Sequence, residues 1–358
     1  MQATPLPFDP DTARLLALAA KAGYPPFEAL TPMAARAAYA ASWEPMQTPG
    51  GEVASVRDVE IPGPAGMNEK TPGRSQVFSH PPGGPGEARA GGTTITLRIY
   101  RGLGTAADTP LPCMLFLHGG GWVIGNLESH DRMCRRLATV ARICVVAVDY
   151  RLAPEHPFPA GLDDSAAALR WVAEHVTELG IDRNSIAVGG DSAGGNLAAA
   201  LALMGRDGSV PPAVFQALIY PVLDLTASSD SYQRVTSGVP LTAATMHWFI
   251  GHYTPRAADR LGWKASPLRA ESLAGAPPAL VLTVTHDPLC DEGRAYARRL
   301  DQDGVRVTAL HCNDQMHGLL GQGKLVRAAN VIADYVFGTI GQELHRAAAP
   351  PRQPPLNP

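Results

Sequence analysis

From residue 112 onward, this chain of 358 residues alternates between short apolar runs and segments with the spacing of helices. We expect strands at 114–117, 143–148, 186–189, 214–220, 280–285 and 305–310. Helical patterns separate most of these runs, for example at 166–179, 193–204 and 294–303. Continuous hydrophobic strands that alternate with helices are typical of a parallel sheet covered on both faces. The pattern therefore predicts one doubly wound α/β domain whose ligands bind at the carboxyl ends of the strands.

The first hundred residues follow a different pattern. Asp9 before Pro10 and Thr31 before Pro32 are typical of helix starts, and they predict Ala-rich amphipathic helices within residues 1–50. Alternating segments at 53–61 and 93–100 predict two strands. The intervening residues are rich in proline and glycine, so we expect a long surface loop or a partly disordered insert at 62–92.

Two further segments complete the predicted organisation. Residues 225–262 are too many for a simple connection and include several aromatic side chains, which suggests helices laid over the carboxyl ends of the strands. The tail at 347–358 is rich in proline, and we expect it to be disordered. The chain then divides into an N-terminal helical segment at 1–50, a main domain at 51–346, and this tail.

Charge and composition exclude several classes of function. Thirty basic against 33 acidic side chains leave a formal net charge of -3, without a long basic run, so nucleic acid is not an expected partner. No stretch approaches the ~20 apolar residues of a membrane span, and no signal peptide is recognisable. We therefore expect a cytoplasmic protein that does not bind membranes. The five cysteines lack metal-type spacing, and we expect free buried thiols.

The sequence Gly-Asp-Ser-Ala-Gly at 190–194 is the first motif with chemical meaning. It follows a predicted strand and begins a predicted helix, which is the arrangement of a nucleophile elbow. Glycines on both sides of Ser192 let the strand and helix backbones approach closely, so that the serine hydroxyl is exposed on a strained turn. This context favours a nucleophile over the alternative, a serine that caps the helix in a tight turn.

A second motif, His-Gly-Gly-Gly-Trp at 118–122, directly follows the strand predicted at 114–117. Three consecutive glycines expose backbone N–H groups that can converge on one point, as the stabilisation of an oxyanion requires. A phosphate-binding loop is the alternative. No lysine follows at the spacing of such a loop, and we therefore favour the oxyanion.

A serine nucleophile needs a general base and an acid to orient it. The histidines that follow Ser192 are His247, His252, His286, His311, His317 and His345. His317 follows the last strand, which we expect to end near Cys312, and should emerge at the carboxyl edge of the sheet beside the elbow, whereas His311 lies inside that strand. Asp287 directly follows the strand at 280–285 and is the expected acid. The carboxylates at 291 and 292 begin the next helix, where they are common as partners of the helix dipole.

Six motifs in this order resemble the bacterial hormone-sensitive lipase family of α/β-hydrolase esterases. They are HGGGW at 118–122, DYRLAPE at 149–155, GDSAG at 190–194, SPL at 266–268, DPLCDEG at 287–293 and MHG at 316–318. The resemblance extends from about residue 93 to 340. The chain departs from the family in the long segment at 62–92, at Cys290 where a basic residue is common, and at Leu319 where an aromatic is common.

The resemblance implies an α/β-hydrolase fold with a mostly parallel sheet, a catalytic domain at 51–346, and a helical cap formed by residues 1–50 and about 225–262. It implies a serine carboxylesterase for short-chain acyl esters, with Ser192 as nucleophile, Asp287 as acid and His317 as base. It also implies an oxyanion hole formed by the N–H groups of Gly120, Gly121 and Ala193, with Gly119 as the alternative. No metal or organic cofactor is expected.

Several other side chains have two plausible roles. Three aromatic residues either line the substrate pocket or pack in the core, namely Trp122, Trp248 and Phe249. For three charged residues we favour a buried ion-pair network under the site over a role in catalysis, namely Arg151, Glu155 and Asp163. For Asp191 we favour a structural hydrogen-bonding role over a role in tuning the nucleophile.

Other functions share this scaffold. The same triad hydrolyses amides, carbamates and lactones. Plant gibberellin receptors resemble the family but have lost the catalytic histidine, so a non-catalytic small-molecule receptor is a further alternative, against which the presence of His317 argues. The expected partner is a small-molecule ester, and a homodimer is one possible assembly.

Overall fold

The computed structural model describes residues 7–64, 93–105 and 109–348. Its centre is an eight-stranded sheet with the order β1-β2-β4-β3-β5-β6-β7-β8. The strands are β1 (Ser55–Pro62), β2 (Thr94–Arg101), β3 (Leu111–Leu117), β4 (Cys144–Asp149), β5 (Ile181–Asp191), β6 (Gln216–Ile219), β7 (Ala279–His286) and β8 (Val307–Met316). β2 is antiparallel to both β1 and β4, and all remaining neighbours are parallel. The predicted mostly parallel sheet is confirmed.

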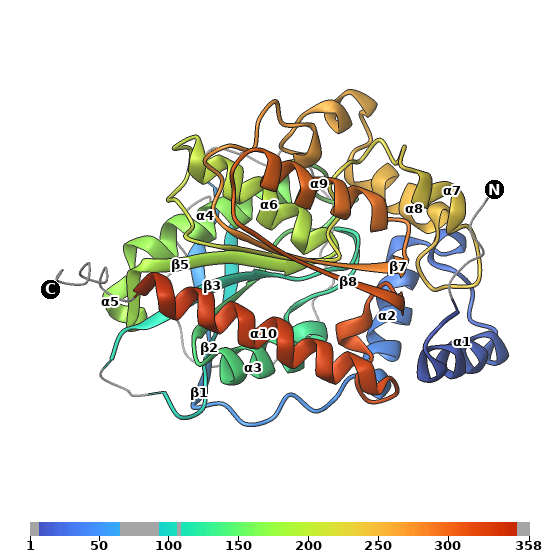
Figure 1. The fold of residues 1–358 in the computed structure, drawn as a ribbon, viewed down its shortest axis with the longest axis horizontal. Helices are drawn as coiled ribbons and strands as arrows, with labels where there is room; N and C mark the ends of the chain where they lie inside the picture. The colour runs from blue at the N-terminus through green and yellow to red at the C-terminus, as the bar shows by residue number, and fades with distance from the viewer. Residues whose placement is uncertain (1–6, 65–92, 106–108, 349–358) are drawn as a thin grey trace, which may run out of the picture.

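Helices cover both faces of this sheet (Figure 1). One face carries α4 (Ala160–Glu174), α6 (Ala193–Arg206) and α9 (Cys290–Gln302), and the other carries α3 (Leu127–Ala141) and α10 (Arg327–Ala348). The fully buried strand β3 explains why both faces are covered. Its successive side chains point to opposite faces of the sheet, and both sets are apolar. Leu115 and Leu117 belong to the hydrophobic cluster under α4 and α6, whereas Met114 and Phe116 belong to the cluster under α3 and α10.

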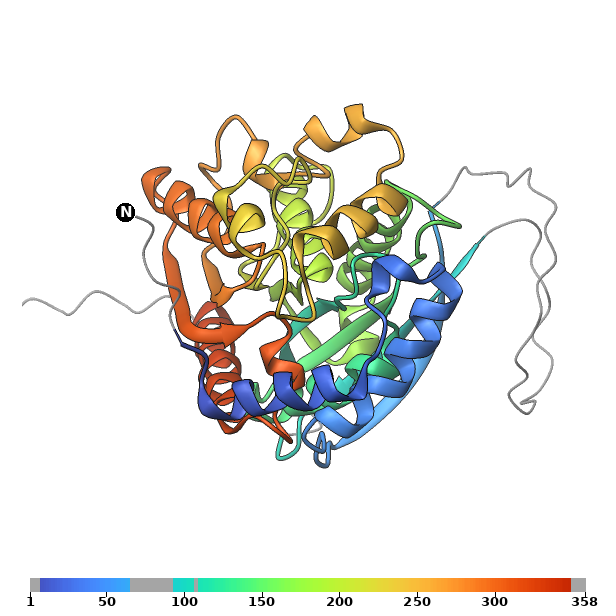
Figure 2. The ribbon, with the colours of Figure 1, turned by 90° about the vertical axis from the view of Figure 1, so that its right-hand side faces the viewer.

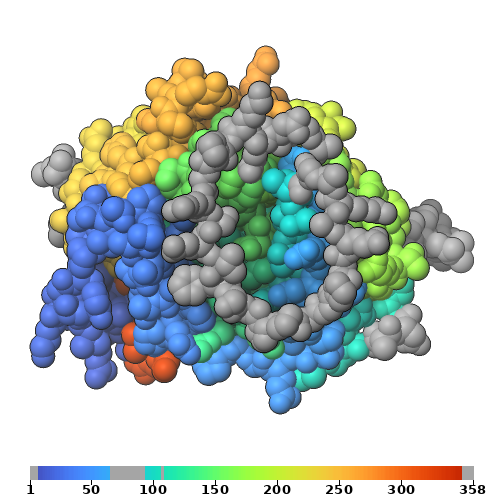
Figure 3. Space-filling model, turned by 180° about the vertical axis from the view of Figure 1, so that it is seen from behind, coloured from blue at the N-terminus to red at the C-terminus, as the bar shows by residue number. Residues whose placement is uncertain are grey.

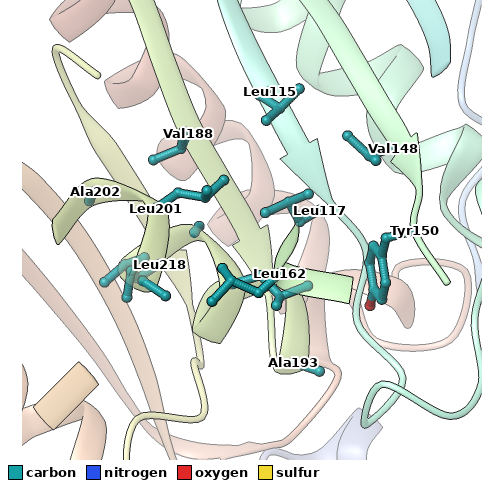
Figure 4. Packing of buried hydrophobic residues seen from close by; sticks show 14 of the residues in the cluster. Leu115, Leu117, Val148, Tyr150, Leu162, Val188, Ala193, Leu201, Ala202 and Leu218 are labelled. Atoms are coloured by element: carbon teal, nitrogen blue, oxygen red, sulfur yellow. The ribbon is translucent and has the colours of Figure 1, made fainter. Parts of the chain in front are cut away.

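The first of these clusters ends beside the elbow (Figure 4). Leu117 of β3, Leu162 of α4, Leu218 of β6 and Ala193, the first residue of α6, belong to this cluster, and Figure 4 shows Ala193 at its lower end. All four side chains are almost completely buried. The elbow therefore rests on a packed core that fixes where α6 begins.

The structure changes several predicted bounds. β8 runs to Met316, beyond the expected end between 310 and 312, because polar side chains at an edge strand remain in solvent and hide the strand pattern. The helix predicted at 166–179 begins at Ala160 and is divided at His175 into α4 and α5 (Val176–Leu179). Helix α10 includes Ala348, so the first two residues of the predicted tail are helical. The rest of that tail and residues 65–92 of the predicted insert lie outside the described residues.

Both predicted N-terminal helices are present, with the expected caps. The Asp9 carboxylate accepts hydrogen bonds from the amides of residues 11 and 12 at the start of α1 (Pro10–Ala22). The Thr31 hydroxyl accepts one from the amide of residue 34 at the start of α2 (Pro32–Met46). A short 3-10 helix, η1 (Phe27–Ala29), connects the two.

The segment predicted to cover the carboxyl ends of the strands is also helical. It contains α7 (Asp230–Arg234), α8 (Ala243–Tyr253) and η2 (Ala257–Leu261), and two further 3-10 helices follow at η3 (Pro267–Arg269) and η4 (Leu319–Gly321). α1, α2, α7 and α8 gather at the end of the sheet toward which β5, β7 and β8 point (Figures 1 and 2). Both segments that were predicted to form a cap, which we call the cap segments, therefore lie at the edge where the site was expected.

The two cap segments contact each other. The Thr245 hydroxyl in α8 donates a 2.8 Å hydrogen bond to the Glu28 carboxylate in η1, and the rings of Phe27 and Phe249 lie 6.0 Å apart. Seen from behind, the N-terminal segment adjoins the α8 region without a break in the surface (Figure 3). At its other end, α1 is attached to β8, since the Thr12 hydroxyl donates to the Gln315 side chain at 2.8 Å.

Two further expectations concern membranes and thiols. Across the described ranges, we find no helix with the length and apolar character that crossing a bilayer requires. All five cysteines are free, as predicted, and four of them are buried, whereas Cys312 is half-buried.

Candidate active site

Ser192 occupies a strained turn between β5 and α6. Its φ of 54° and ψ of -118° lie in a region that side chains other than glycine rarely adopt, at a cost of about 1–3 kcal/mol. A Cβ atom on Gly190 or Gly194 would overlap the carbonyl oxygen of Leu117, which confirms why both neighbours are glycine. The Ser192 amide donates to the Ile219 carbonyl at 2.9 Å, so β6 holds the turn in place.

The expected acid and base converge on this serine. His317 Nε2 lies 2.9 Å from Ser192 Oγ, and His317 Nδ1 lies 2.7 Å from Asp287 Oδ2. Asp287 is completely buried, and its other oxygen accepts a 2.9 Å hydrogen bond from the Leu289 amide. The three residues follow β5, β7 and β8, whose carboxyl ends meet at one edge of the sheet. The arrangement can therefore transfer a proton from the serine to the imidazole.

The rejected candidates lie elsewhere. His311 is inside β8, as predicted, where its ring nitrogens lie 2.8 Å and 3.1 Å from the hydroxyls of Thr283 and Thr285, and burial lowers its pKa. Asp291 pairs with Arg234 at 2.9 Å. Glu292 differs from the expectation for a helix-start carboxylate, because it is buried and accepts the Leu223 amide at 2.6 Å. Burial raises the pKa of Glu292 well above its usual range.

The glycine-rich loop bends beside the elbow. Gly120 and Gly121 have φ values of 117° and 57°, which favour glycine. The Gly119 amide donates a 2.9 Å hydrogen bond to the Asp191 carboxylate. Within the part of the chain that the structure describes, the amides of Gly120 and Gly121 donate to no protein acceptor. Two backbone donors at this loop are therefore available to a ligand.

The three aromatic candidates lie in different surroundings. Phe249 covers the loop, since a Cβ atom on Gly121 would overlap its ring. Trp248 is half-buried with its ring centre 5.1 Å from that of Phe249. Trp122 is buried with its ring stacked on Tyr253 at 4.2 Å, which favours core packing over the pocket role.

The predicted buried ion-pair network is only partly present. Arg151 pairs at 2.8 Å with Asp164, which is completely buried, rather than with Asp163. Glu155 is not in this network, because it pairs at 2.6 Å with Arg36 of the cap helix α2, and its side chain is more than half exposed. The sequence did not show which of two adjacent aspartates faces inward, nor that the cap reaches Glu155.

Two residues near the triad had no predicted role. The Tyr220 ring lies 4.8 Å from that of His317, and its φ of 35° is unusual for a residue other than glycine. His130 of α3 lies 3.2 Å from the Asp191 carboxylate. Neither belongs to a motif with a known spacing, so only the fold places them here. The described residues hold no group of three or more His, Cys, Asp or Glu side chains that could bind a metal ion.

Comparison with known sequences gives consistent matches. A family model described as the alpha/beta hydrolase fold matches residues 114–321. Carboxylesterase NlhH of Mycobacterium tuberculosis is 40% identical over 257 residues, which cover 71% of this chain and 80% of that protein. Ethyl acetate hydrolase of Pseudomonas putida is 41% identical over 243 residues, which cover 67% of this chain and 76% of that protein.

Solved structures agree. A thermostable esterase from Pseudomonas putida has a TM-score of 0.83 and 33% identity, covering 96% of this chain and 99% of that one. An ester hydrolase from the metagenome of Lake Arreo, in complex with a derivative of bipyridine phosphonate, has a TM-score of 0.83 and 37% identity. That match covers 94% of this chain and 99% of the other.

Proposed function

This chain belongs to the alpha/beta hydrolase family and is a carboxylic ester hydrolase, and we propose that Ser192 is its nucleophile, with His317 as base and Asp287 as acid. The matches confirm the resemblance to the hormone-sensitive lipase family found in the sequence. One observation carries the proposal, namely the continuous contact from Asp287 through His317 to Ser192, at 2.7 Å and 2.9 Å.

The reaction follows from this contact. His317 Nε2 accepts the hydroxyl proton while Ser192 Oγ attacks the ester carbonyl, and Asp287 stabilises the imidazolium through Nδ1–H. The C–O bond of the ester then breaks, and the alcohol leaves with the proton from Nε2. Water attacks the acyl-serine and gives a proton to His317. The carboxylic acid leaves, and Ser192 regains its proton.

The oxyanion formed in each half of the reaction needs donors. The free amides of Gly120 and Gly121 support the proposed hole, whereas the Gly119 amide is already engaged by Asp191. Ala193 supplies the third donor at the amino end of α6, where the helix dipole favours negative charge. The loss of one such donor costs roughly 3–4 kcal/mol of transition-state stabilisation.

We further propose a preference for esters of about two to six acyl carbons, because the segments over the site are small and helical rather than a broad apolar lid. Phe249 over Gly121 and Phe27 beside it support a short pocket. One similar protein is named for hydrolysis of ethyl acetate. Kinetics with p-nitrophenyl esters of increasing acyl length measure this preference. Faster hydrolysis of emulsified long-chain triglyceride than of soluble butyrate esters would contradict it.

We also propose that the protein forms a homodimer and lies in the cytoplasm. β8 forms an edge of the sheet, which leaves one side of its backbone without a strand partner and could pair with a second copy. Light scattering in solution measures the mass and decides between monomer and dimer. Cell fractionation tests the cytoplasmic location. Amide, carbamate and lactone substrates in the kinetic panel test the alternative bond preferences.

Covalent labelling tests the nucleophile. An organophosphonate should add once per chain, with the adduct on the peptide that contains Ser192, because the hydroxyl next to His317 is the activated one. Ser192→Ala should lose both the adduct and esterase activity, while circular dichroism shows an unchanged fold. Activity retained in this variant, or an adduct mapped to another serine, would sink the mechanism.

A further inference from the structure

Asp191 joins two parts of the site that are far apart in the sequence. It directly precedes Ser192, and its Oδ1 accepts the Gly119 amide at 2.9 Å. The proposed oxyanion donors Gly120 and Gly121 follow this amide by one and two residues. A single carboxylate therefore connects the nucleophile elbow to the loop that must bind the oxyanion.

His130 extends this contact to α3. Its Nε2 lies 3.2 Å from Asp191 Oδ1 and 3.3 Å from the Gly119 nitrogen. Its Nδ1 lies 2.9 Å from the Ser129 hydroxyl, which belongs to the capping box at the start of α3. Both side chains of the pair are almost completely buried. The imidazole thus supports the carboxylate from a rigid helix.

The electrostatics favour an ionised carboxylate at this buried position. Burial raises the pKa of Asp191, but the contacts with His130 and with the Gly119 amide outweigh burial and hold that pKa below its usual range. Charge-assisted hydrogen bonds are about twice as strong as neutral ones. The Asp191 contact is therefore a strong restraint on the loop.

Within the loop, the Gly120 carbonyl accepts hydrogen bonds from the amides of Val123 and Ile124 at 3.1 Å and 2.9 Å, but it is the Asp191 carboxylate that joins the loop to the elbow. Three consecutive glycines leave the backbone flexible, and a Cβ atom on Gly119 would overlap the Asp191 carboxylate. The same peptide is held on its other side, where the Tyr150 hydroxyl donates to the His118 carbonyl at 2.6 Å. Oxyanion donors act only when they lie about 2.7–3.1 Å from the developing charge. Small movements of the loop should therefore slow the reaction.

We propose that Asp191 and His130 are positioning residues that keep the oxyanion loop in register with Ser192. The proposal rests on the proposed oxyanion donors at Gly120 and Gly121. Substrate in its ground state carries no oxyanion, so a displaced loop should weaken transition-state binding more than substrate binding. The expected signature is a fall in kcat with KM almost unchanged.

The test compares Asp191→Ala, His130→Ala, the double variant and Asp191→Asn with p-nitrophenyl butyrate. Asp191→Ala should lower kcat by about 10- to 100-fold, somewhat less than the loss of an oxyanion donor itself. Asp191→Asn should recover most of this loss, since its amide oxygen still accepts the Gly119 N–H. Because His130 acts through Asp191, the double variant should be no slower than Asp191→Ala.

Asp131→Ala is the matched control. Asp131 follows His130 on α3, but its carboxylate contacts Tyr100 and Arg135 rather than the loop. This control should lose stability in urea unfolding yet keep the wild-type kcat. Equal kcat losses in the control, or additive losses in the double variant, would overturn the proposal.

A further readout separates this proposal from the mechanism itself. Phosphonate labelling of Asp191→Ala should still reach one adduct per chain on Ser192, but at a rate reduced in parallel with kcat. Failure of the mechanism would show in the wild-type protein as a missing adduct. If Asp191→Ala does not fold, the test uses His130→Ala instead. An unchanged kcat in this variant would refute the proposal that His130 and Asp191 position the loop.

Discussion

At the scale of single residues, position relative to a strand end decides which carboxylate lies beside the His317 imidazole. Asp287 and Asp291 are four residues apart and both are near the site. Asp287 Oδ2 lies 2.7 Å from His317 Nδ1, whereas Asp291 pairs with Arg234 at 2.9 Å. The first residue after β7 turns inward under the imidazole, and the start of α9 turns the later one toward Arg234.

Two isosteric variants test this assignment. Asp287→Asn should lower kcat by about 10⁴ at neutral pH, because an amide favours the wrong imidazole tautomer. Asp291→Asn should cost about 0.3–1 kcal/mol of stability and leave kcat near wild type, since its carboxylate acts at a helix start. Both proteins are first checked for folding by circular dichroism. The reverse result, with Asp291→Asn inactive and Asp287→Asn active, would show that Asp287 is not the acid.

At the scale of elements, one arginine of helix α2 contacts three residues of the main domain. Arg36 Nε donates to the Val123 carbonyl at 2.8 Å, just beyond the glycine-rich loop, and another guanidinium nitrogen donates to the Ala153 carbonyl at 2.9 Å. The same side chain pairs with Glu155 at 2.6 Å. One residue of α2 thus holds two loops at the carboxyl edge of the sheet.

Removal of this side chain should loosen the cap. Arg36→Ala should destabilise the protein by about 1.5–3 kcal/mol, the range for hydrogen bonds to a charged group that are partly buried. Arg256→Ala is the control, because Arg256 pairs with Asp259 while largely exposed, and it should cost less than about 1 kcal/mol. Urea unfolding midpoints measure both. Equal midpoints for the two variants would show that α2 is held by other contacts.

At the scale of the whole molecule, buried ionisable groups couple stability to pH. Burial, and then the nearby charge of His130, lower the pKa of His118 from 6.5 to about 3. The unfolded chain therefore binds a proton on this residue between those two values, while the native protein does not. Stability that is present above pH 6.5 must fall as the pH drops toward 3.

His118→Asn should weaken this dependence. The amide can still donate toward the Gly119 carbonyl, as His118 Nδ1 does at 2.8 Å, but it does not titrate. Between pH 6.5 and 3, the wild-type unfolding free energy should fall more steeply than that of the variant, by at most about 1.4 kcal/mol per pH unit. The difference in unfolding free energy between the two proteins at pH 8 is the baseline, because His118 is neutral in both the folded and the unfolded state at that pH. Parallel curves for the two proteins would contradict the lowered pKa.

Features that depend on neighbours along the chain can be predicted from the amino-acid order alone. The alternation of apolar runs and helices specified the parallel sheet, and the glycines around Ser192 specified the elbow, because both follow from local geometry. The sequence also placed Asp287 and His317 at strand ends, where parallel topology brings them to one edge. The sequence pattern did not reveal the polar end of β8, because an edge strand does not need apolar alternation.

Contacts between segments that are distant in the sequence depend on the folded structure. It turned Asp164 rather than Asp163 toward Arg151, and it placed His130 against Asp191. It also brought Phe249 over Gly121. Such contacts depend on the order of strands in the sheet and on how helices pack over it, and no local pattern encodes them. The strained turn around Ser192 can therefore be predicted from the sequence, whereas the contacts that hold the glycine-rich loop depend on the folded protein.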